Sequence, residues 1–366
     1  MKLTALVFAL LGASVGSAAA QHAATVYGVL DAGVVSERGC ASNCSVRVDS
    51  GMASASRVGV RGSEAIDGNL AVVYGLEAGV QLDSGHADQG GRLFGRQAYV
   101  GIQGAAGTLS VGRQQNLQYS AVTEVGDPFK GGTAGSATNL IGTAGRREDN
   151  SIHYTSGAVH GVSAAASYAR DEPATPAAGK PLAMAGNRSW GLSVGVAAGA
   201  LVLRAAHQNR SVAGVAPSTQ MGNNSLDAKN SVLAANMRMG FGTAYAAYSV
   251  SRGAASSPLW NPDNPYSAAI ASTPSTDSRD MLVGLAVPCG GATLLASFIR
   301  KNDRDAANQD ARQVALGATY ALSRRTDFYA AYSRINNRAG AAYTVGNASA
   351  PGGGSSAVNV GMRHAF

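Results

Sequence analysis

Hydrophobic and polar side chains alternate along most of this chain with a period of two residues. In the run 25–34, apolar side chains fill positions 26, 30, 32 and 34, and Thr25, Tyr27 and Asp31 lie between them. Successive side chains of a β-strand point to opposite faces, so this pattern predicts strands with one apolar and one polar face. The alternation continues to the final run, 358–366, without a competing helical period. The sequence therefore predicts an all-β fold.

The predicted connections between strands alternate in length. Short turns fall near 67–69, 105–107, 158–161, 198–200, 239–242, 288–291 and 323–326, and long polar loops near 38–54, 84–91, 123–149, 173–187, 213–229, 254–278, 303–310 and 339–355. These fifteen connections predict sixteen strands. An even-numbered antiparallel barrel with short turns at one rim and long loops at the other suits a bacterial outer membrane, because lipid tolerates no unpaired strand edge. A soluble β-sandwich or β-helix would also alternate, but it requires neither this pattern of turn lengths nor an export signal.

The third long loop, 123–149, needs an explanation of its own. A strand-like run, 108–113, leads into a glycine-rich segment that ends in the charged run 146–149. Loops of more than about 15 residues without structure are uncommon in compact domains and are usually functional or disordered. Because strands flank this loop on both sides, we expect it to fold inside the barrel. A disordered surface insertion is the alternative.

The first twenty residues have the pattern of a secretory signal peptide. Lys2 is the basic n-region, the run 3–11 is a short apolar core, and Ala18 to Ala20 form a small-residue cleavage site before Gln21. We therefore expect residues 1–20 to be a cleaved signal peptide and residues 21–366 to form the barrel. A signal anchor is the alternative, but no stop-transfer run follows.

Composition and charge change this picture little. The 366 residues include 47 glycines, only 14% are charged, and apolar residues are spread evenly along the chain, which is unusual for a soluble enzyme. Removal of Lys2 with the signal leaves 28 Lys and Arg against 22 Asp and Glu residues, a net charge of +6. The basic residues do not cluster with interleaved aromatic residues, so we exclude nucleic acid as a partner.

Few residues suggest catalysis or a metal site. The six histidines are scattered, none in a Ser or Cys nucleophile motif or at metal-ligand spacing, so we expect no enzyme activity, no metal and no cofactor. A barrel lipase or protease, with Ser and His paired across strands, is the alternative. Cys40 and Cys44 are close in sequence, and export to an oxidising compartment favours a disulfide between them. Cys289 has no obvious partner and is interpreted as a structural thiol near a turn.

Several long segments, in order, resemble the general porins of β-proteobacteria: 25–33, 56–64, 91–101, 107–114 and the ending 360–366. The resemblance covers nearly the whole mature chain. It implies a homotrimer in the bacterial outer membrane, in contact with outer-membrane lipid and lipopolysaccharide, whose third loop enters the lumen. It also implies that the assembly machinery recognises Phe366. Relatives commonly carry a Pro-Glu-Phe-Gly-Gly-like sequence in that loop, whereas this chain has Asp127-Pro-Phe-Lys-Gly-Gly132.

The same resemblance identifies candidate residues of a pore constriction. It places wall arginines opposite loop acids, at Arg57, Arg61, Arg96, Arg113, Glu124 and Asp127, with Arg92 nearby. Rings of charge at a narrow aqueous passage select ions without binding them tightly. We therefore expect a diffusion channel for small hydrophilic solutes and ions, weakly anion-preferring, with its constriction between loop 123–149 and the wall arginines. A substrate-specific channel would require an aromatic ladder, which is not evident. A plugged barrel acting as an adhesin would be distinguished by single-channel conductance.

Overall fold

A computed structural model of the chain describes residues 24–40, 44, 46–170, 188–211, 227–258, 275–345 and 354–366. The expected signal peptide lies outside these residues, as does the long connection 173–187. The connections 213–229, 254–278 and 339–355 lie partly outside them.

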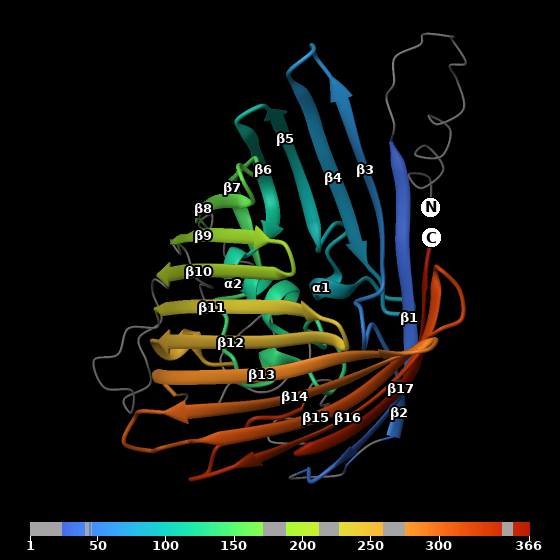
Figure 1. Ribbon diagram of the computed structural model, residues 1–366, viewed down its shortest axis with the longest axis vertical. Helices are drawn as coiled ribbons and strands as arrows, with labels where there is room; N and C mark the ends of the chain where they lie inside the picture. The colour runs from blue at the N-terminus through green and yellow to red at the C-terminus, as the bar shows by residue number, and fades with distance from the viewer. Residues whose placement is uncertain are drawn as a thin grey trace, which may run out of the picture.

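Antiparallel strands form one sheet that closes on itself (Figure 1). The strands are β1 (Thr25–Arg38), β2 (Val46–Ser50), β3 (Arg57–Ala65), β4 (Ala71–Gly79), β5 (Gln97–Gly104), β6 (Gly107–Gln115), β7 (Arg147–Ser156), β8 (Val162–Arg170), β9 (Arg188–Ala198), β10 (Leu201–Ser211), β11 (Ala228–Met239), β12 (Gly242–Arg252), β13 (Asp277–Cys289), β14 (Ala292–Asp303), β15 (Ala311–Ala321), β16 (Thr326–Asn337) and β17 (Ser356–Ala365). Strand β1 closes the barrel, because it pairs with β17 on one edge and with β3 and β2 on the other.

The predicted sixteen-stranded antiparallel barrel is confirmed. Each strand from β3 to β17 pairs with the next one in sequence, and β1 completes the circle. The additional strand β2 lies within the connection 38–54, which the sequence pattern predicted as one long loop. It is only five residues long and pairs with β1 at Ala32–Ser36. A strand this short adds little to the alternation that the pattern detects.

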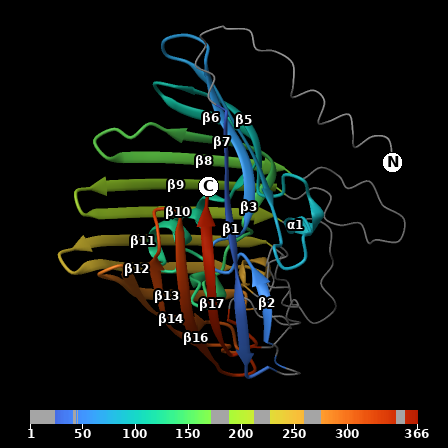
Figure 2. The ribbon, with the colours of Figure 1, turned by 90° about the vertical axis from the view of Figure 1, so that its right-hand side faces the viewer.

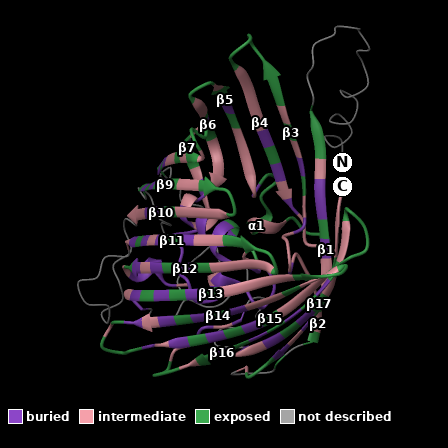
Figure 3. Ribbon diagram, in the orientation of Figure 1, coloured by how far each residue is buried: buried purple, intermediate pink, exposed green. Residues whose placement is uncertain are grey.

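The two faces of the sheet differ in polarity as the alternation predicts. Large apolar side chains such as Val26, Leu192 and Leu316 are more than half exposed on one face. Polar side chains such as Gln208 and Gln313 are fully buried on the other. Figure 3 shows the resulting bands of exposed and buried residues along the strands. An apolar outer face and a polar inner face are what a barrel in lipid requires.

Short helical segments interrupt three of the connections between strands. They are α1 (Asp88–Gly91), α2 (Leu117–Ser120), the π-helical turn η2 (Ala121–Gly126), and the 3₁₀ turns η3 (Ala137–Asn139) and η4 (Ala254–Ser256). The sequence pattern did not predict them, because three to six residues cannot establish a helical period. None of the helices in the described part of the chain is long and apolar enough to span a membrane.

Cysteine pairing follows the expectation. Cys40 and Cys44 form a disulfide in the connection between β1 and β2. Cys289 is a free, exposed thiol at the last residue of β13.

Candidate functional site

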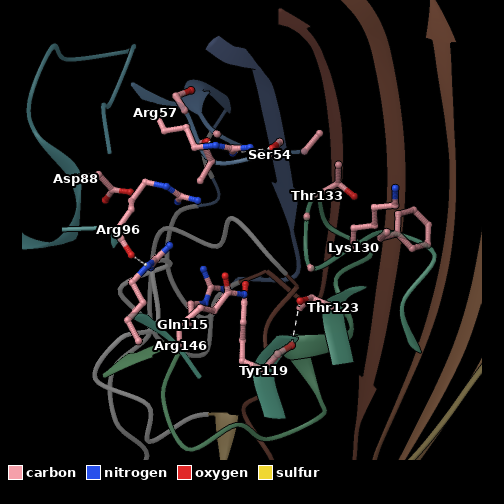
Figure 4. A pocket seen from close by; sticks show the side chains of 18 of the residues that line it. Ser54, Arg57, Asp88, Arg96, Gln115, Tyr119, Thr123, Lys130, Thr133 and Arg146 are labelled. Atoms are coloured by element: carbon pink, nitrogen blue, oxygen red, sulfur yellow. Dashed lines mark hydrogen bonds between the residues drawn. The ribbon is translucent and has the colours of Figure 1, made fainter. Parts of the chain in front are cut away.

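A cavity of about 1670 Å³ lies between the segment 119–149 and the wall around β3 to β6. Figure 4 shows Arg57 and Arg96 on one side of it and Lys130 and Thr133 on the other. Eleven Lys and Arg side chains and six Asp and Glu side chains line the cavity, a difference of five positive charges. The described lining is therefore strongly basic.

Glu77 holds two of the cavity arginines together. Its carboxylate accepts from Nε of Arg96 at 2.6 Å, lies 3.3 Å from Nε of Arg57 and accepts from the hydroxyl of Tyr27 at 2.9 Å. Arg57 also donates to Oγ of Ser54 and to the carbonyl of Ala55. One nearly buried acid thus fixes two guanidinium groups at the cavity wall.

Asp149 holds a second pair of arginines at an irregularity of the sheet. The register between β6 and β7 shifts at Gly112 to Gln114, so Arg113 has no partner on β7, although it remains opposite Ala98 on β5. Bulges redirect side chains in this way. Arg113 contacts Asp149 and donates to the carbonyl of Gly95 at 2.7 Å, and Arg92 donates to the same carboxylate at 2.6 Å. The charged stretch before β5 is therefore attached to β6 and β7.

Arg147 and Arg146 add positive charge between these two clusters. Arg147 donates to the backbone carbonyl of Arg96 at 2.9 Å. The guanidinium of Arg146 lies 5.3 Å from the ring centre of Tyr119, which is the last but one residue of α2. Asn116 caps α2 by accepting from the backbone N–H groups of Gln118 and Tyr119, as Asn does at many helix N-termini.

The six predicted constriction residues do not all reach the cavity. Arg57, Arg96, Arg113 and Glu124 line it, and Glu124 pairs with Arg204 of β10 at 2.8 Å. Arg61 is exposed further along β3, where its guanidinium lies 4.9 Å from the ring centre of Tyr27. It is not among the residues that line the cavity.

Asp127 is fully buried within the loop and does not line the cavity. Its carboxylate accepts from the backbone N–H groups of Phe129, Gly131 and Ala137 at 2.8 to 2.9 Å. Burial raises the pKa of Asp127 to about 6, and the three amides act in the opposite direction. This carboxylate closes the turn that precedes η3.

The loop segment 121–141 packs against the polar face of the sheet over many strands. Its apolar side chains Val122, Val125, Leu140 and Ile141 belong to one buried cluster with residues of β10 to β17. The backbone carbonyls of Val125, Gly135 and Leu140 accept from Asn236 of β11, Gln313 of β15 and Lys301 of β14, in that order. Two wall glycines leave space for the loop, since a Cβ at Gly284 or Gly317 would lie under 3 Å from Pro128 or Phe129.

A second segment, the strap 51–56, contacts this loop near Thr133. Asp31, fully buried on β1, accepts from the backbone N–H groups of Ala53 and Ser54 and from the hydroxyl of Tyr329. The N–H of Thr133 donates to the carbonyl of Met52. The strap therefore joins β1 and β16 to the loop, and it carries Ser54 beside Arg57.

Sequence reasoning missed Glu77 and the strap, and it named the charged run 146–149 without assigning a position to Arg147 or Asp149. Glu77 is the only charged residue of β4, and an isolated acid in an otherwise uncharged strand was the feature that could have identified it. Within the described residues, no group of three or more His, Cys, Asp and Glu side chains could hold a metal ion.

A closed barrel with an apolar outer face and a charged inner cavity defines an outer-membrane channel. A family model described as Gram-negative porin matches residues 3–340. The chain belongs to this family of outer-membrane porins, whose members are channels and not enzymes.

Individual relatives agree with this assignment. An outer membrane porin protein of Bordetella pertussis (strain Tohama I) is 28% identical over 407 residues, and outer membrane porin protein 32 of Delftia acidovorans is 26% identical over 382 residues, with all of both chains covered in each case. The solved anion-selective porin from Comamonas acidovorans has a TM-score of 0.74 at 22% identity, covering 94% of this chain and 100% of its own. Salmonella typhi OmpF in complex with daunomycin has a TM-score of 0.67 at 15% identity, covering 94% of this chain and 97% of its own.

Proposed function

We propose that this porin passes small hydrophilic solutes and ions and prefers anions to cations. The excess of five positive charges around the cavity carries the proposal. Charges in an aqueous passage act over about 8 Å at physiological salt, so fixed charges on the wall enrich counter-ions across a narrow channel. The solved porin from Comamonas acidovorans is described as anion-selective, which agrees in sign with this charge balance.

We further propose that the segment 123–149 lies in the lumen and forms the constriction with Arg57, Arg96 and Arg113. Its hydrogen bonds to Asn236, Gln313 and Lys301 support this, because these three side chains come from three different strands of the wall. In this proposal Glu124 faces the passage, Asp127 holds the loop turn, and Arg61 acts at longer range through its charge.

The remaining expectations concern assembly. We propose a homotrimer that is exported with the signal peptide 1–20, contacts outer-membrane lipid and lipopolysaccharide, and is inserted by the assembly machinery through Phe366. Phe366 is 42% exposed, which leaves it accessible to such a partner.

The zero-current potential under a salt gradient tests the anion preference. Arg57→Gln with Arg96→Gln removes two of the five excess charges and leaves Glu77 unpaired, so the anion-to-cation permeability ratio should fall to roughly half or less. Adding Glu77→Gln restores one unit of charge, and the ratio should recover in part. Glu124→Gln should shift the potential in the opposite direction, further toward anion preference.

Arg300→Gln is the matched control, because Arg300 is exposed on the outer face and does not line the cavity. It should leave the potential unchanged. A potential that stays at the wild-type value in the Arg57 and Arg96 double variant would remove these side chains from the passage and contradict the proposal.

A further inference from the structure

Four arginines form a patch on the outer face of the barrel, at the rim that carries the long loops. They are Arg279 of β13, Arg300 of β14, Arg312 of β15 and Arg334 of β16, and all four are exposed. We call them the rim arginine patch. Each lies near the strand end that meets a long connection, 254–278, 303–310 or 339–355.

The strand register brings these charges close together. Arg300 and Arg312 are directly opposite each other on neighbouring strands. Arg334 is opposite Val314, one outward position from Arg312, and Arg279 is opposite Asn302, one outward position from Arg300. Directly opposite side chains have Cβ atoms about 5 Å apart, and diagonal ones about 7 to 8 Å. The four guanidinium groups can therefore reach one ligand.

Nothing in the described structure neutralises the patch. No carboxylate among the described residues pairs with any of the four arginines. The outward positions of β14, β15 and β16 carry no Asp or Glu. On β13 the outward acid Asp277 lies two residues from Arg279 and is opposite Arg252 on β12. Like charges placed directly opposite each other destabilise a sheet, so the patch calls for an anionic partner.

The position of the patch indicates where that partner lies. Directly below it, on the same outer face, are Met281, Phe298, Val314 and Tyr332, which are 41 to 55% exposed. Such apolar and aromatic side chains face the acyl chains and the interface of a bilayer. Arginines one step beyond them lie at headgroup level, and guanidinium groups bind phosphate through two parallel hydrogen bonds.

We propose that the rim arginine patch binds the phosphorylated headgroup of a glycolipid in the leaflet at the long-loop rim. The headgroup phosphates sit among Arg300, Arg312 and their two neighbours, and the acyl chains lie along Phe298 and Val314. Free phosphate has no part that fits these apolar side chains. A second copy of this chain would bring further arginines to the same patch. The inference rests on the proposed contact with outer-membrane glycolipid and names its site.

The test compares lipid binding by the purified porin in detergent, using lipid A with both phosphates and the same lipid after dephosphorylation. The variant carries Arg300→Gln, Arg312→Gln and Arg334→Gln together. The control carries Arg238→Gln, Arg324→Gln and Arg325→Gln, which remove three exposed charges at the opposite rim. We expect the patch variant, but not the control, to bind lipid A at least tenfold more weakly than the wild type does. The wild type and the patch variant should bind the dephosphorylated lipid equally. Inorganic phosphate at equal concentration should not compete with lipid A.

Thermal stability gives an independent readout with a definite sign. In lipid-free detergent, Arg312→Gln alone should raise the melting temperature, because it removes the charge opposite Arg300. Added lipid A should stabilise the wild type more than this variant. Equal lipid A affinity of the wild type and the patch variant, or competition by inorganic phosphate, would overturn the proposal. The conductance and selectivity of the patch variant should stay at wild-type values, so failure here is separable from failure of the pore proposal.

Discussion

At the scale of single residues, the cavity is built from carboxylates that each serve several partners. Glu77 contacts Arg57, Arg96 and Tyr27, and Asp149 contacts Arg92 and Arg113. Charge-assisted hydrogen bonds of this kind fix long side chains in one orientation. The arginines are therefore held at the wall, and their charge remains in excess because each acid is shared.

Asp127 gives a pH-dependent prediction for the loop. Its pKa is raised from 3.8 to about 6 by burial, so the carboxyl binds its proton more tightly in the packed loop than in a loop released into water. The packed loop should therefore gain stability as the pH falls from 7.5 to 5 and lose it as the pH rises. Hydrogen exchange of residues 127–137, corrected for the intrinsic rate, should be about tenfold slower at pH 5 than at pH 7.5.

Asp127→Asn supplies the control for this measurement, because it keeps the shape of the side chain and cannot titrate. In that variant the protection of 127–137 should not depend on pH. Faster corrected exchange at pH 5 than at pH 7.5 in the wild type would show that the three backbone amides outweigh burial.

At the scale of elements, the alternation of side chains was sufficient to predict the strands. Every predicted strand run, from 25–34 to 358–366, corresponds to a strand in the barrel, because the membrane outside and the water inside impose one period on the whole wall. Between Arg92 and Val100 the alternation places charged and bulky side chains on the same face, because β5 begins only at Gln97 and the arginines before it follow no strand parity.

The segments between the strands could not be predicted in the same way. The strap 51–56 depends on contacts with Asp31, which is distant in sequence. The position of Arg113 at the register shift depends on Asp149, which lies outside the regular ladder between β6 and β7. Local pattern carries no information on such contacts. Tyr27 is a similar case: a tyrosine near the end of a barrel strand is typical of an interfacial aromatic girdle, but the Tyr27 hydroxyl donates to Glu77 beside the cavity.

Removal of Lys130 to Thr143 tests the proposed role of the loop. The deletion removes Asn139, which donates to Gln313 of β15, and Leu140, whose carbonyl accepts from Lys301 of β14. It leaves the strands β6 and β7 intact. If the loop narrows the lumen, single-channel conductance should rise by about twofold or more and larger solutes should pass, since a sixteen-stranded barrel without an obstruction encloses an aqueous channel.

Phe129→Ala is a milder companion variant, because it removes the ring that packs against Gly317 without shortening the loop. It should increase current noise and change the mean conductance less than the deletion does. Unchanged conductance in a correctly folded deletion variant would place the loop outside the conducting path.

At the scale of the whole molecule, closure of the barrel depends on the pairing of its first and last strands. The backbones of Gly28 and Phe366 exchange two hydrogen bonds of 3.1 Å at the end of the seam between β1 and β17. The Phe366 ring lies over Gly28, where an added Cβ would be 2.4 Å from a ring carbon. The terminal residue thus has a structural position as well as a proposed role in recognition.

Deletion of Phe366 should leave unassembled periplasmic protein and abolish heat-resistant trimer in cells, whereas Phe366→Tyr, which keeps the backbone bonds and an aromatic ring, should assemble normally. Refolding from urea into detergent separates the two roles of this residue, because no assembly machinery is present. If the deletion variant refolds in detergent but fails in cells, recognition is the requirement. If it fails in both, loss of the Gly28 pairing at the seam is sufficient, because an open edge exposes unpaired backbone groups to the hydrophobic phase. Heat-resistant trimer at wild-type levels in cells expressing the deletion variant would contradict both roles.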